Sequence, residues 1–416
     1  MKRIFRLSMI LGLMVVMCSG LYSNGFNLNS NGTKALSMGG AFVGLADDFS
    51  AAFWNPAGLT QLKEGTLSLF MVDIIPQGVQ YQFSIPGLVN VDATAVTKHY
   101  LSGSFGFFKP LSDKVVIGLY TYVPTGLGVE WEGSELWALT NGVKYRWRTY
   151  VGIVTIAPAI AFKLSDKFSL GATVNINYGF AELEKPALGQ YEEKTDGMAF
   201  GATIGMLFKP TEKLSFGLTY RTPLKVTLKG DAAMSGARLL GLPREDKAER
   251  EANFPMWLAG GIAFKPTDKL TFTADVQWTN WKKMESIPMT FSNAGWKAYF
   301  EPGANLDLRW KDALQFRLGM EYKATEKLAL RAGYYNDQNP GNSKTLTILL
   351  PEHAYNWITF GLGFISEKMT VELGFEYGFG DAIEIGIADL GVNDPGMPGT
   401  HKMAIMSPNI SLTYRF

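Results

Sequence analysis

Apolar side chains alternate with polar or glycine residues along many short stretches of this chain. After Glu212, for example, Leu214, Phe216 and Leu218 are separated by small or polar residues. A period of two puts the two sets of side chains on opposite faces of a β-strand. Stretches of roughly 9–11 residues in this pattern are typical of membrane-spanning barrels. A soluble antiparallel sandwich, whose strands also alternate, is the alternative.

A short turn motif recurs six times between these stretches. Each copy has a small polar residue followed by an acid and usually a lysine, residue types that favour tight turns. Six turns join twelve strands, and one further strand at each end (about Thr66–Ile74 and about Met403–Phe416) brings the predicted total to fourteen. An even number is typical of bacterial barrels. The acids of the six turns are Asp113, Asp166, Glu212, Asp268, Glu326 and Glu367.

Connections on the other side of the predicted barrel are longer. In outer-membrane barrels the short turns face the periplasm and the long links face outward. We therefore expect the long links outside the cell. They span about 75–97, 124–146, 184–195, 231–250, 281–312, 337–352 and 381–402.

The N-terminus has the pattern of a secretory signal peptide. Basic residues at Lys2, Arg3 and Arg6 precede an apolar run over 7–18 and then small residues. We expect residues 1–23 to be removed on export. An uncleaved anchor is the alternative, although the run is shorter than the ~20 residues that a span needs. Beyond residue 24 no uncharged apolar run of ~18 residues occurs, which leaves a closed barrel as the way to cross lipid.

The chain ends in an alternating stretch, Ile410–Phe416, whose last residue is phenylalanine. Such a strand resembles the one that the outer-membrane assembly machinery recognises, so this machinery is an expected partner. The predicted fold class is all-β: a 14-stranded antiparallel transmembrane β-barrel over residues 66–416. The expected location is the outer membrane of a Gram-negative-type bacterium.

Charge and motif content argue against several other functions. The formal net charge of +1 provides no electrostatic footprint for nucleic acid. The three histidines lie in or near expected loops, and we find no Ser/His/acid cluster, metal-ligand spacing or nucleotide-binding loop. We therefore expect no enzymatic activity, no cofactor and no metal site.

Residues 24–65 lack strand alternation and are rich in Gly, Ala, Ser and Asn. A fourteen-stranded barrel is too wide for its own side chains to fill, since the interior closes at about eight strands. Pro56 restricts Asn55 to extended geometry, and Asn and Gly favour tight turns. This segment is therefore predicted to be a hatch with short helices that plugs the lumen.

Short motifs in this region and beyond it carry a family resemblance. They are Gly25-Phe26, Met38-Gly39-Gly40-Ala41, Ala46-Asp47-Asp48, Asn55-Pro56-Ala57, Tyr220-Arg221 and Trp310-Lys311-Asp312. Together they resemble the FadL family of outer-membrane long-chain fatty acid transporters, over essentially the whole mature chain. The resemblance implies a fourteen-stranded barrel with a hatch in its lumen. It also implies the passage of fatty acids or, as in some relatives, of aromatic hydrocarbons.

Period-two parity places a set of charged residues of both signs on the inner face of the barrel. Because buried charges need partners, we expect charge pairing around the hatch; water-solvated charges in a channel are the alternative. The set comprises Arg221, Asp275, Arg317, Glu321, Arg331, Glu372 and Glu376.

Lys185 continues the inward parity of the fifth strand towards the outer end of the lumen. The resemblance implies that it holds a ligand carboxylate, and that Arg309 and Lys311 lie close to a second ligand-binding lysine. A solvated loop residue is the alternative for each. Aromatic residues in the long links are candidates for the first capture of a hydrophobic ligand, among them Trp137, Trp296 and Phe300.

The third strand, expected over Val115–Val123, runs into Pro124, Gly126 and Gly128. Proline lacks a ladder donor and glycine permits bends, so strand pairing should break there. The resemblance implies a kinked third strand that leaves a gap in the barrel wall. The ordinary start of an extracellular loop is the alternative.

These observations predict a monomeric channel for the passive uptake of long-chain fatty acids or similar hydrophobic molecules. The expected steps are capture by the loops, binding in the lumen, movement of the hatch and lateral exit through the third strand into outer-membrane lipid. Uptake of aromatic hydrocarbons, or a surface adhesin or receptor built on a barrel scaffold, are the alternatives.

Overall fold

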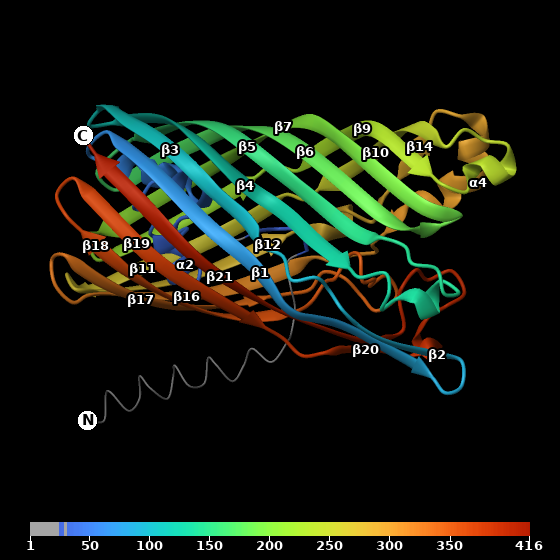
Figure 1. The fold of residues 1–416 in the computed structure, drawn as a ribbon. Coiled ribbons are helices and arrows are strands. Elements are labelled where there is room, and N and C mark those ends of the chain that lie inside the picture. Colours follow the sequence, from blue (N-terminus) through green and yellow to red (C-terminus); the bar gives the residue numbers. More distant parts are fainter. Residues whose placement is uncertain (1–24, 29–30) are drawn as a thin grey trace.

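The computed structural model describes residues 25–28 and 31–416, so the predicted signal peptide over 1–23 lies outside the described residues. Fourteen of the described strands close into an antiparallel barrel (Figure 1). The ring closes where β21 pairs with β1, with Leu67 opposite Tyr414. In ring order the strands are β1 (Thr66–Ile85), β3 (Tyr100–Ser112), β4 (Val115–Trp131), β5 (Trp147–Lys163), β6 (Phe168–Ala187), β7 (Gly189–Thr211), β8 (Leu214–Arg221), β11 (Trp257–Thr267), β12 (Leu270–Thr279), β16 (Ala313–Lys323), β17 (Leu328–Asp337), β18 (Tyr355–Ile365), β19 (Met369–Phe379) and β21 (Gly399–Arg415).

The two faces of each strand differ in polarity, and this difference sets which face of the barrel wall points outward. Along β1, Leu67 and Leu69 are 39% and 46% exposed, whereas Ser68 between them is 1% exposed. The apolar set faces lipid and the polar set faces the lumen, as in outer-membrane barrels. The predicted fold class and strand number are confirmed, and the six predicted turns are short connections at the end of the barrel where the C-terminus lies (Figure 1).

At the opposite end, several strands continue beyond the apolar band. The links predicted over 184–195 and 231–250 are wrong in extent, because β6 and β7 continue until they meet at Leu188. Outward-facing residues there become charged, as at Glu182 and Glu184, so the polarity pattern of a membrane strand ends while the hydrogen-bonded ladder continues. A second hairpin, β9 (Leu224–Met234) and β10 (Glu245–Phe254), extends β8 and β11 in the same way.

The remaining extracellular elements are short and cover this end of the barrel (Figure 1). They are β2 (Val89–Thr94), η2 (Trp137–Leu139), η3 (Ala237–Leu240), η4 (Trp281–Lys283), β13 (Ser286–Ile287), β14 (Met289–Phe291), α4 (Ala294–Ala304), β15 (Leu306–Asp307), β20 (Ile383–Ile385) and η5 (Ile387–Asp389).

The hatch fills the lumen towards the short-turn end. Its helices are α2 (Thr33–Ser37), α3 (Ala51–Trp54) and η1 (Pro56–Gln61), and Figure 1 shows α2 enclosed by strands. None of the described helices has the length and apolar character that a bilayer crossing requires. The core of the hatch, including Phe49 and Trp54, packs against inward side chains of the wall such as Phe70 and Tyr120.

Candidate functional site

Asn55 joins the hatch to the barrel wall. Its side-chain amide donates to the carbonyl of Val43 in the hatch and to that of Met206 in β7, each at 2.9 Å. Its side-chain oxygen accepts from the N–H of Ala57 and so caps η1. Gly205 of β7 lies opposite, where a Cβ would come 2.1 Å from the same oxygen. Only glycine leaves room for the hatch to approach the wall this closely.

The other residues of the predicted hatch motif stabilise the hatch locally. Pro56 occupies the first position of η1, where a missing N–H removes no helical hydrogen bond. Asp48 accepts from the N–H and the hydroxyl of Ser50 at 2.8 and 2.6 Å. Asp47 forms an ion pair with Lys34 at 2.7 Å. The motif therefore holds the hatch together and fixes it to the wall.

Arg331 is the centre of a buried charge network in the lumen. Its guanidinium lies 2.7 Å from Glu321 and 3.0 Å from Glu372, and all three side chains are almost fully buried. Lys34 of the hatch lies 3.8 Å from Glu321. Charges of opposite sign therefore connect α2 to the wall, as a buried group of charges requires.

Two other predicted lumen cations lie against aromatic rings. The guanidinium of Arg221 is 4.4 Å from the ring centroid of Phe53 in the hatch and 4.7 Å from that of Trp257. The guanidinium of Arg317 is 4.8 Å from the ring of Tyr335. Desolvated cation–π contacts of this kind are attractive.

Two predicted lumen carboxylates accept hydrogen bonds. Asp275 accepts from the backbone N–H of Val43 at 2.7 Å, which fixes the hatch to β12. Glu376 accepts from the hydroxyl of Tyr335 at 3.4 Å. All of these predicted lumen charges lie inside the barrel, where their parity predicted them to be.

The wall of the barrel is interrupted between β3 and β4. The two strands pair only from Ser112 opposite Val115 to Phe105 opposite Thr121. Beyond that point β3 still pairs with β1 as far as Tyr100, and β4 still pairs with β5. On the extracellular side of the opening, Ala95 forms an isolated antiparallel β-bridge with Trp131. The N–H of Val96 donates to the backbone carbonyl of Glu130 there. The opening is therefore bounded at both ends.

Pro124 lies at the irregularity that creates this opening. One extra residue is inserted in β4 between Tyr122 and Thr125, and a bulge of this kind bends its strand. The predicted end of the third strand at Val123 is wrong, because β4 resumes its ladder with β5 and continues to Trp131. Pairing is lost only on the β3 side.

The two predicted glycines of β4 lie beside this opening. A Cβ on Gly128 would come 2.1 Å from the ring of Tyr100, which reaches across from β3. A Cβ on Gly126 would come 3.0 Å from the side chain of Leu28. Both glycines therefore leave room for groups that cover the opening.

The N-terminal segment Phe26–Leu28 fills the inner side of the opening. The N–H of Leu28 donates to the carbonyl of Pro124 at 2.9 Å, and the N–H of Gly126 donates to that of Phe26 at 3.1 Å. Asn27 therefore lies directly opposite Thr125 as a one-residue antiparallel bridge. This segment supplies the hydrogen-bond partner that β3 no longer provides.

Phe26 anchors this segment in an aromatic cluster. Its ring centroid lies 4.9 Å from Trp310, 6.2 Å from Trp281 and 6.3 Å from Phe254. The side chain is 2% exposed. The anchor is therefore an apolar contact, whereas the hatch is fixed to the wall at Asn55 and Lys34 by polar contacts.

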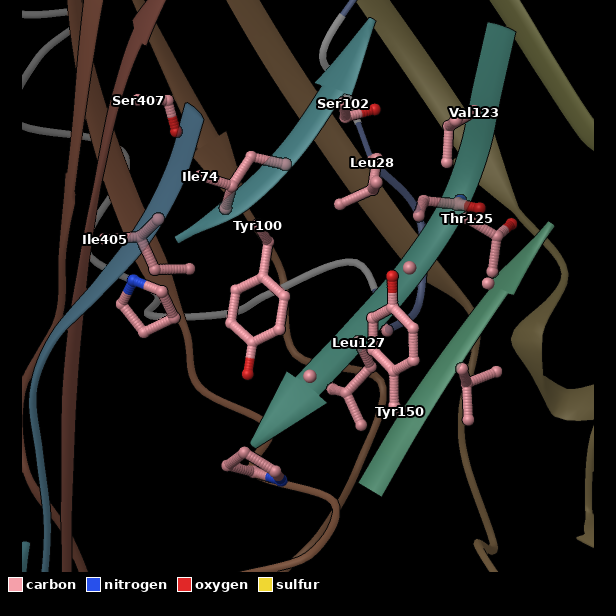
Figure 2. Close-up of a pocket in the computed structure, with 18 of the residues that line it drawn as sticks. Leu28, Ile74, Tyr100, Ser102, Val123, Thr125, Leu127, Tyr150, Ile405 and Ser407 are labelled. Carbon is pink, nitrogen blue, oxygen red and sulfur yellow. The ribbon is translucent and has the colours of Figure 1, made fainter. Parts of the chain in front are cut away.

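A cavity of about 340 Å³ lies at this opening. Figure 2 shows its lining from β1, β3, β4, β5 and β21, with Leu28 of the N-terminal segment among these side chains. The rings of Tyr100 and Tyr150 lie 6.2 Å apart, and Phe180 lies 5.3 Å from Tyr150. Leu101 on the lipid-facing side is 75% exposed. An apolar and aromatic surface therefore connects the lumen with the lipid side of the barrel.

Lys185 lies above the apolar band, on the inner face of β6. Its Nζ is 5.8 Å from the ring centroid of Tyr191. Arg250 forms a buried bidentate ion pair with Glu193 nearby, at 2.7 and 2.6 Å. Burial and the positive charge of Arg250 lower the pKa of Lys185 below its usual range. Lys185 has no ion pair in the part of the chain that the structure describes, so an incoming carboxylate would meet an unneutralised cation.

Arg309 and Lys311 have different surroundings. Arg309 pairs at 2.6 Å with both Asp307 and Asp394, so its charge is already neutralised by two acids. Lys311 is exposed, and its backbone N–H donates to the carbonyl of Pro340. The contacts of both residues therefore differ from those of Lys185, which lies against Tyr191.

The three predicted capture aromatics also differ from one another. Trp137 is 55% exposed on η2. Trp296 is fully buried, donates to the carbonyl of Pro243 and packs against Phe291 and Phe300. A ligand outside the barrel therefore cannot meet the ring of Trp296 first, because the first turn of α4 buries it.

The residues that sequence reasoning missed are those around the opening. Phe26–Leu28 was assigned only to the hatch, and Tyr100 and Tyr150 were not identified as site residues. The one signal in the sequence was Gly25-Phe26, which belongs to the family resemblance. Among residues 25–28 and 31–416, no cluster of His, Cys, Asp or Glu could hold a metal ion.

Fold and site together define an outer-membrane β-barrel transport protein with an internal hatch. Residues 14–416 match the model of the family described as "Outer membrane protein transport protein (OMPP1/FadL/TodX)", and the chain belongs to this family. It is therefore an outer-membrane transporter of hydrophobic compounds. The fold and the location predicted from the sequence agree with this assignment.

Three relatives illustrate the range of the family. The chain is 22% identical to a long-chain fatty acid transport protein of Salmonella typhi, over 92% of this chain and 94% of that protein. A solved FadL homologue from Pseudomonas aeruginosa has a TM-score of 0.76 at 19% identity, covering 94% of this chain and 100% of the other. The toluene transporter TodX of Pseudomonas putida has a TM-score of 0.71 at 17% identity, covering 96% and 100%.

Proposed function

We propose that this protein takes up long-chain fatty acids or similar hydrophobic molecules and releases them laterally into the membrane through the opening between β3 and β4. The observation that carries the proposal is the closure of this opening by Phe26–Leu28, a segment that two backbone hydrogen bonds hold against β4. Withdrawing so short a segment costs far less than separating two paired barrel strands. The segment is thus suited to act as a gate.

The proposed path begins at the extracellular end and needs no energy source. A ligand first meets exposed apolar side chains such as Trp137. Its carboxylate then pairs with Lys185, a partly buried cation that has no ion pair among the described residues. Its apolar part is desolvated by the aromatic surface around Tyr100 and Tyr150, which replaces water contacts with apolar ones.

A reversible cross-link tests the gate directly. Asn27 and Thr125 form the non-hydrogen-bonded pair of their bridge, where Cα atoms lie roughly 4.5 Å apart, within the range that a disulfide spans. The double variant Asn27→Cys/Thr125→Cys should form this disulfide on oxidation. Uptake of labelled oleate by cells that lack other importers should then fall at least about tenfold and recover with a reductant.

A second cysteine pair serves as the matched control. Ser68 and Thr413 face each other on the intact seam between β1 and β21. The variant Ser68→Cys/Thr413→Cys should leave uptake unchanged in both redox states. Normal uptake through the cross-linked Asn27→Cys/Thr125→Cys protein would show that the ligand does not leave past the N-terminal segment.

Aromatic hydrocarbons are the second candidate cargo. The observation that favours them is the ring-lined surface of the opening, formed by Tyr100, Tyr150 and Phe180. Toluene carries no carboxylate and would gain nothing from Lys185. Measuring toluene and oleate uptake side by side in the Lys185→Ala variant separates the two candidates, since only fatty acid uptake should fall.

A further inference from the structure

The cavity at the opening between β3 and β4, which we call the exit cavity, has almost no charge on its lining. Asp337, at the end of β17, is the one charged residue that lines it in the described part of the chain. Lys185, the cation proposed to hold a carboxylate, is not among the lining residues. A carboxylate that reaches the exit cavity therefore meets an acid and none of the described cations.

Three basic side chains beside the opening already have acid partners. One of them, Arg148, lies 5.9 Å from the ring centroid of Tyr150, which lines the exit cavity. The pairs are Arg148 with Glu182 at 3.0 Å, Lys98 with Glu130 at 3.0 Å and His99 with Asp73 at 2.6 Å. An ionised carboxylate without a partner is costly to move into an apolar environment. These side chains offer it no spare charge on the way out.

Acidic groups also predominate around Asp337 on the lumen side. Its carboxylate accepts a hydrogen bond from the side-chain amide of Gln315. Arg317 interacts electrostatically with Asp337, and also with Asp275 and Glu376. The side chain of Arg317 is fully buried against the hatch and the wall. Three acidic side chains therefore share one buried cation, which leaves no positive charge for an anionic ligand.

Tyr355 lies directly opposite Asp337, on β18, and also lines the exit cavity. Its side chain is 4% exposed, and its hydroxyl is buried without a hydrogen-bond partner among the described residues. Buried polar groups are nearly always hydrogen-bonded, so a hydroxyl in this state indicates a partner that arrives from outside the chain. Side by side, Tyr355 offers an O–H donor and Asp337 an acceptor.

We infer that Tyr355 and Asp337 select uncharged ligands that carry a hydroxyl group, namely the undissociated fatty acid or a fatty alcohol. The inference rests on the proposed function, because it concerns the ligand that leaves through the opening. An undissociated carboxyl group can donate to Asp337 and accept from Tyr355, whereas a carboxylate only accepts and is repelled by Asp337. The proton comes from water: as the carboxylate leaves Lys185, one of its oxygens forms an O–H bond with a solvent proton.

Uptake of oleate, oleyl alcohol and toluene at about pH 6 and pH 8 tests the inference, in cells that lack other importers and after subtraction of uptake without the barrel. For the natural protein, the ratio of oleate to oleyl alcohol uptake should fall at least about fivefold at the higher pH, because less of the acid is undissociated. Asp337→Asn should raise this ratio at pH 8 by about threefold or more, since one like charge is removed. Tyr355→Phe should lower oleyl alcohol uptake by about threefold or more, the effect of one lost hydrogen bond, and leave toluene uptake unchanged.

The matched controls are Asp231→Asn, at an exposed extracellular ion pair, and Tyr322→Phe, on the lipid-facing side of β16. Both should behave like the natural protein. A ratio that does not change with pH or with Asp337→Asn, or an equal loss of toluene uptake in Tyr355→Phe, would overturn the inference.

The disulfide of the Asn27→Cys/Thr125→Cys variant separates this failure from failure of the proposed function. If the disulfide blocks all three compounds although Asp337→Asn and Tyr355→Phe change nothing, the lateral route stands and only the selection of uncharged ligands is wrong. If the disulfide blocks none of them, the lateral route is wrong and the inference falls with it.

Discussion

The contacts that hold the hatch against the barrel wall differ from those that hold the N-terminal segment Phe26–Leu28 there. At Asn55 the hatch is fixed by buried hydrogen bonds, and Lys34 connects it at 3.8 Å to Glu321 in the buried charge network of Arg331. At the opening in the wall, Phe26–Leu28 is held by two backbone hydrogen bonds and one aromatic anchor. Polar contacts of the first kind are costly to break because each leaves a buried group without a partner. We therefore expect the N-terminal segment to move while the rest of the hatch stays in place.

The largest effect on stability is expected from Arg331→Ala, in the buried charge network of the lumen. Glu321 and Glu372 would be left buried without their cation, and the free energy of unfolding should fall by about 3–5 kcal/mol. Urea titration of the protein refolded in lipid vesicles measures this loss. Arg148→Ala is the control, because Arg148 pairs with acids on the exposed outer face and should cost only about 0–1 kcal/mol. Similar small losses in both variants would contradict the view that the network holds the hatch.

Asn55→Ala should have the next largest effect. It removes the partner of two buried carbonyls and the cap of η1, which together cost about 2–3 kcal/mol. The natural protein should conduct few ions in planar bilayers, and this variant should show frequent transient openings. Asn90→Ala, on the exposed β2 strand, should leave the conductance unchanged. If bilayers that contain the Asn55→Ala variant show no increase in ion conductance, other contacts keep the hatch closed.

Phe26→Ala tests whether the N-terminal segment Phe26–Leu28 is the part that moves. The loss of a buried phenylalanine weakens the hold on the N-terminal segment by about 2 kcal/mol, which raises the population of the withdrawn state by more than about tenfold. Uptake of oleate should increase while the free energy of barrel unfolding hardly changes. Phe200→Ala, which removes a lipid-facing ring of β7, is the control. Decreased uptake with Phe26→Ala would indicate that Phe26 contacts the ligand.

Lys185→Ala should have the smallest of these effects. Fatty acid affinity should fall by about 1.5 kcal/mol, at the lower end for a hydrogen bond to a charged group because the side chain is only partly buried. Lys144→Ala, an exposed loop lysine, should change nothing. The pKa of Lys185 is lowered by burial and by Arg250. Its contribution to carboxylate binding should therefore be complete below that pKa and disappear as pH rises through it, at a lower pH than for an exposed lysine. An affinity that is independent of Lys185 and of pH would remove this residue from the site.

Much of the barrel could be predicted because the sequence pattern that specifies its strands is local. Period-two polarity and a repeated turn determine strand, face and strand number without reference to distant residues. The inward position of Arg331 and the hatch role of Asn55 follow from the same pattern and from the composition of residues 24–65. Where the outward-facing residues become charged, as at Glu182, apolar and polar residues no longer alternate although the strand continues. The predicted link over 184–195 was too long for this reason.

The sequence by itself therefore determined a fourteen-stranded barrel, its two faces and a plug of small residues. Only the tertiary structure decided where the wall opens and what closes it. Pro124 indicated an irregularity, but the side on which pairing is lost depends on β3 and β5, which approach it from distant parts of the chain. The closure by Phe26–Leu28 depends on contacts with Trp281 and Trp310, more than 250 residues away. Such contacts arise from packing and not from local periodicity, so no pattern within a single strand could reveal them.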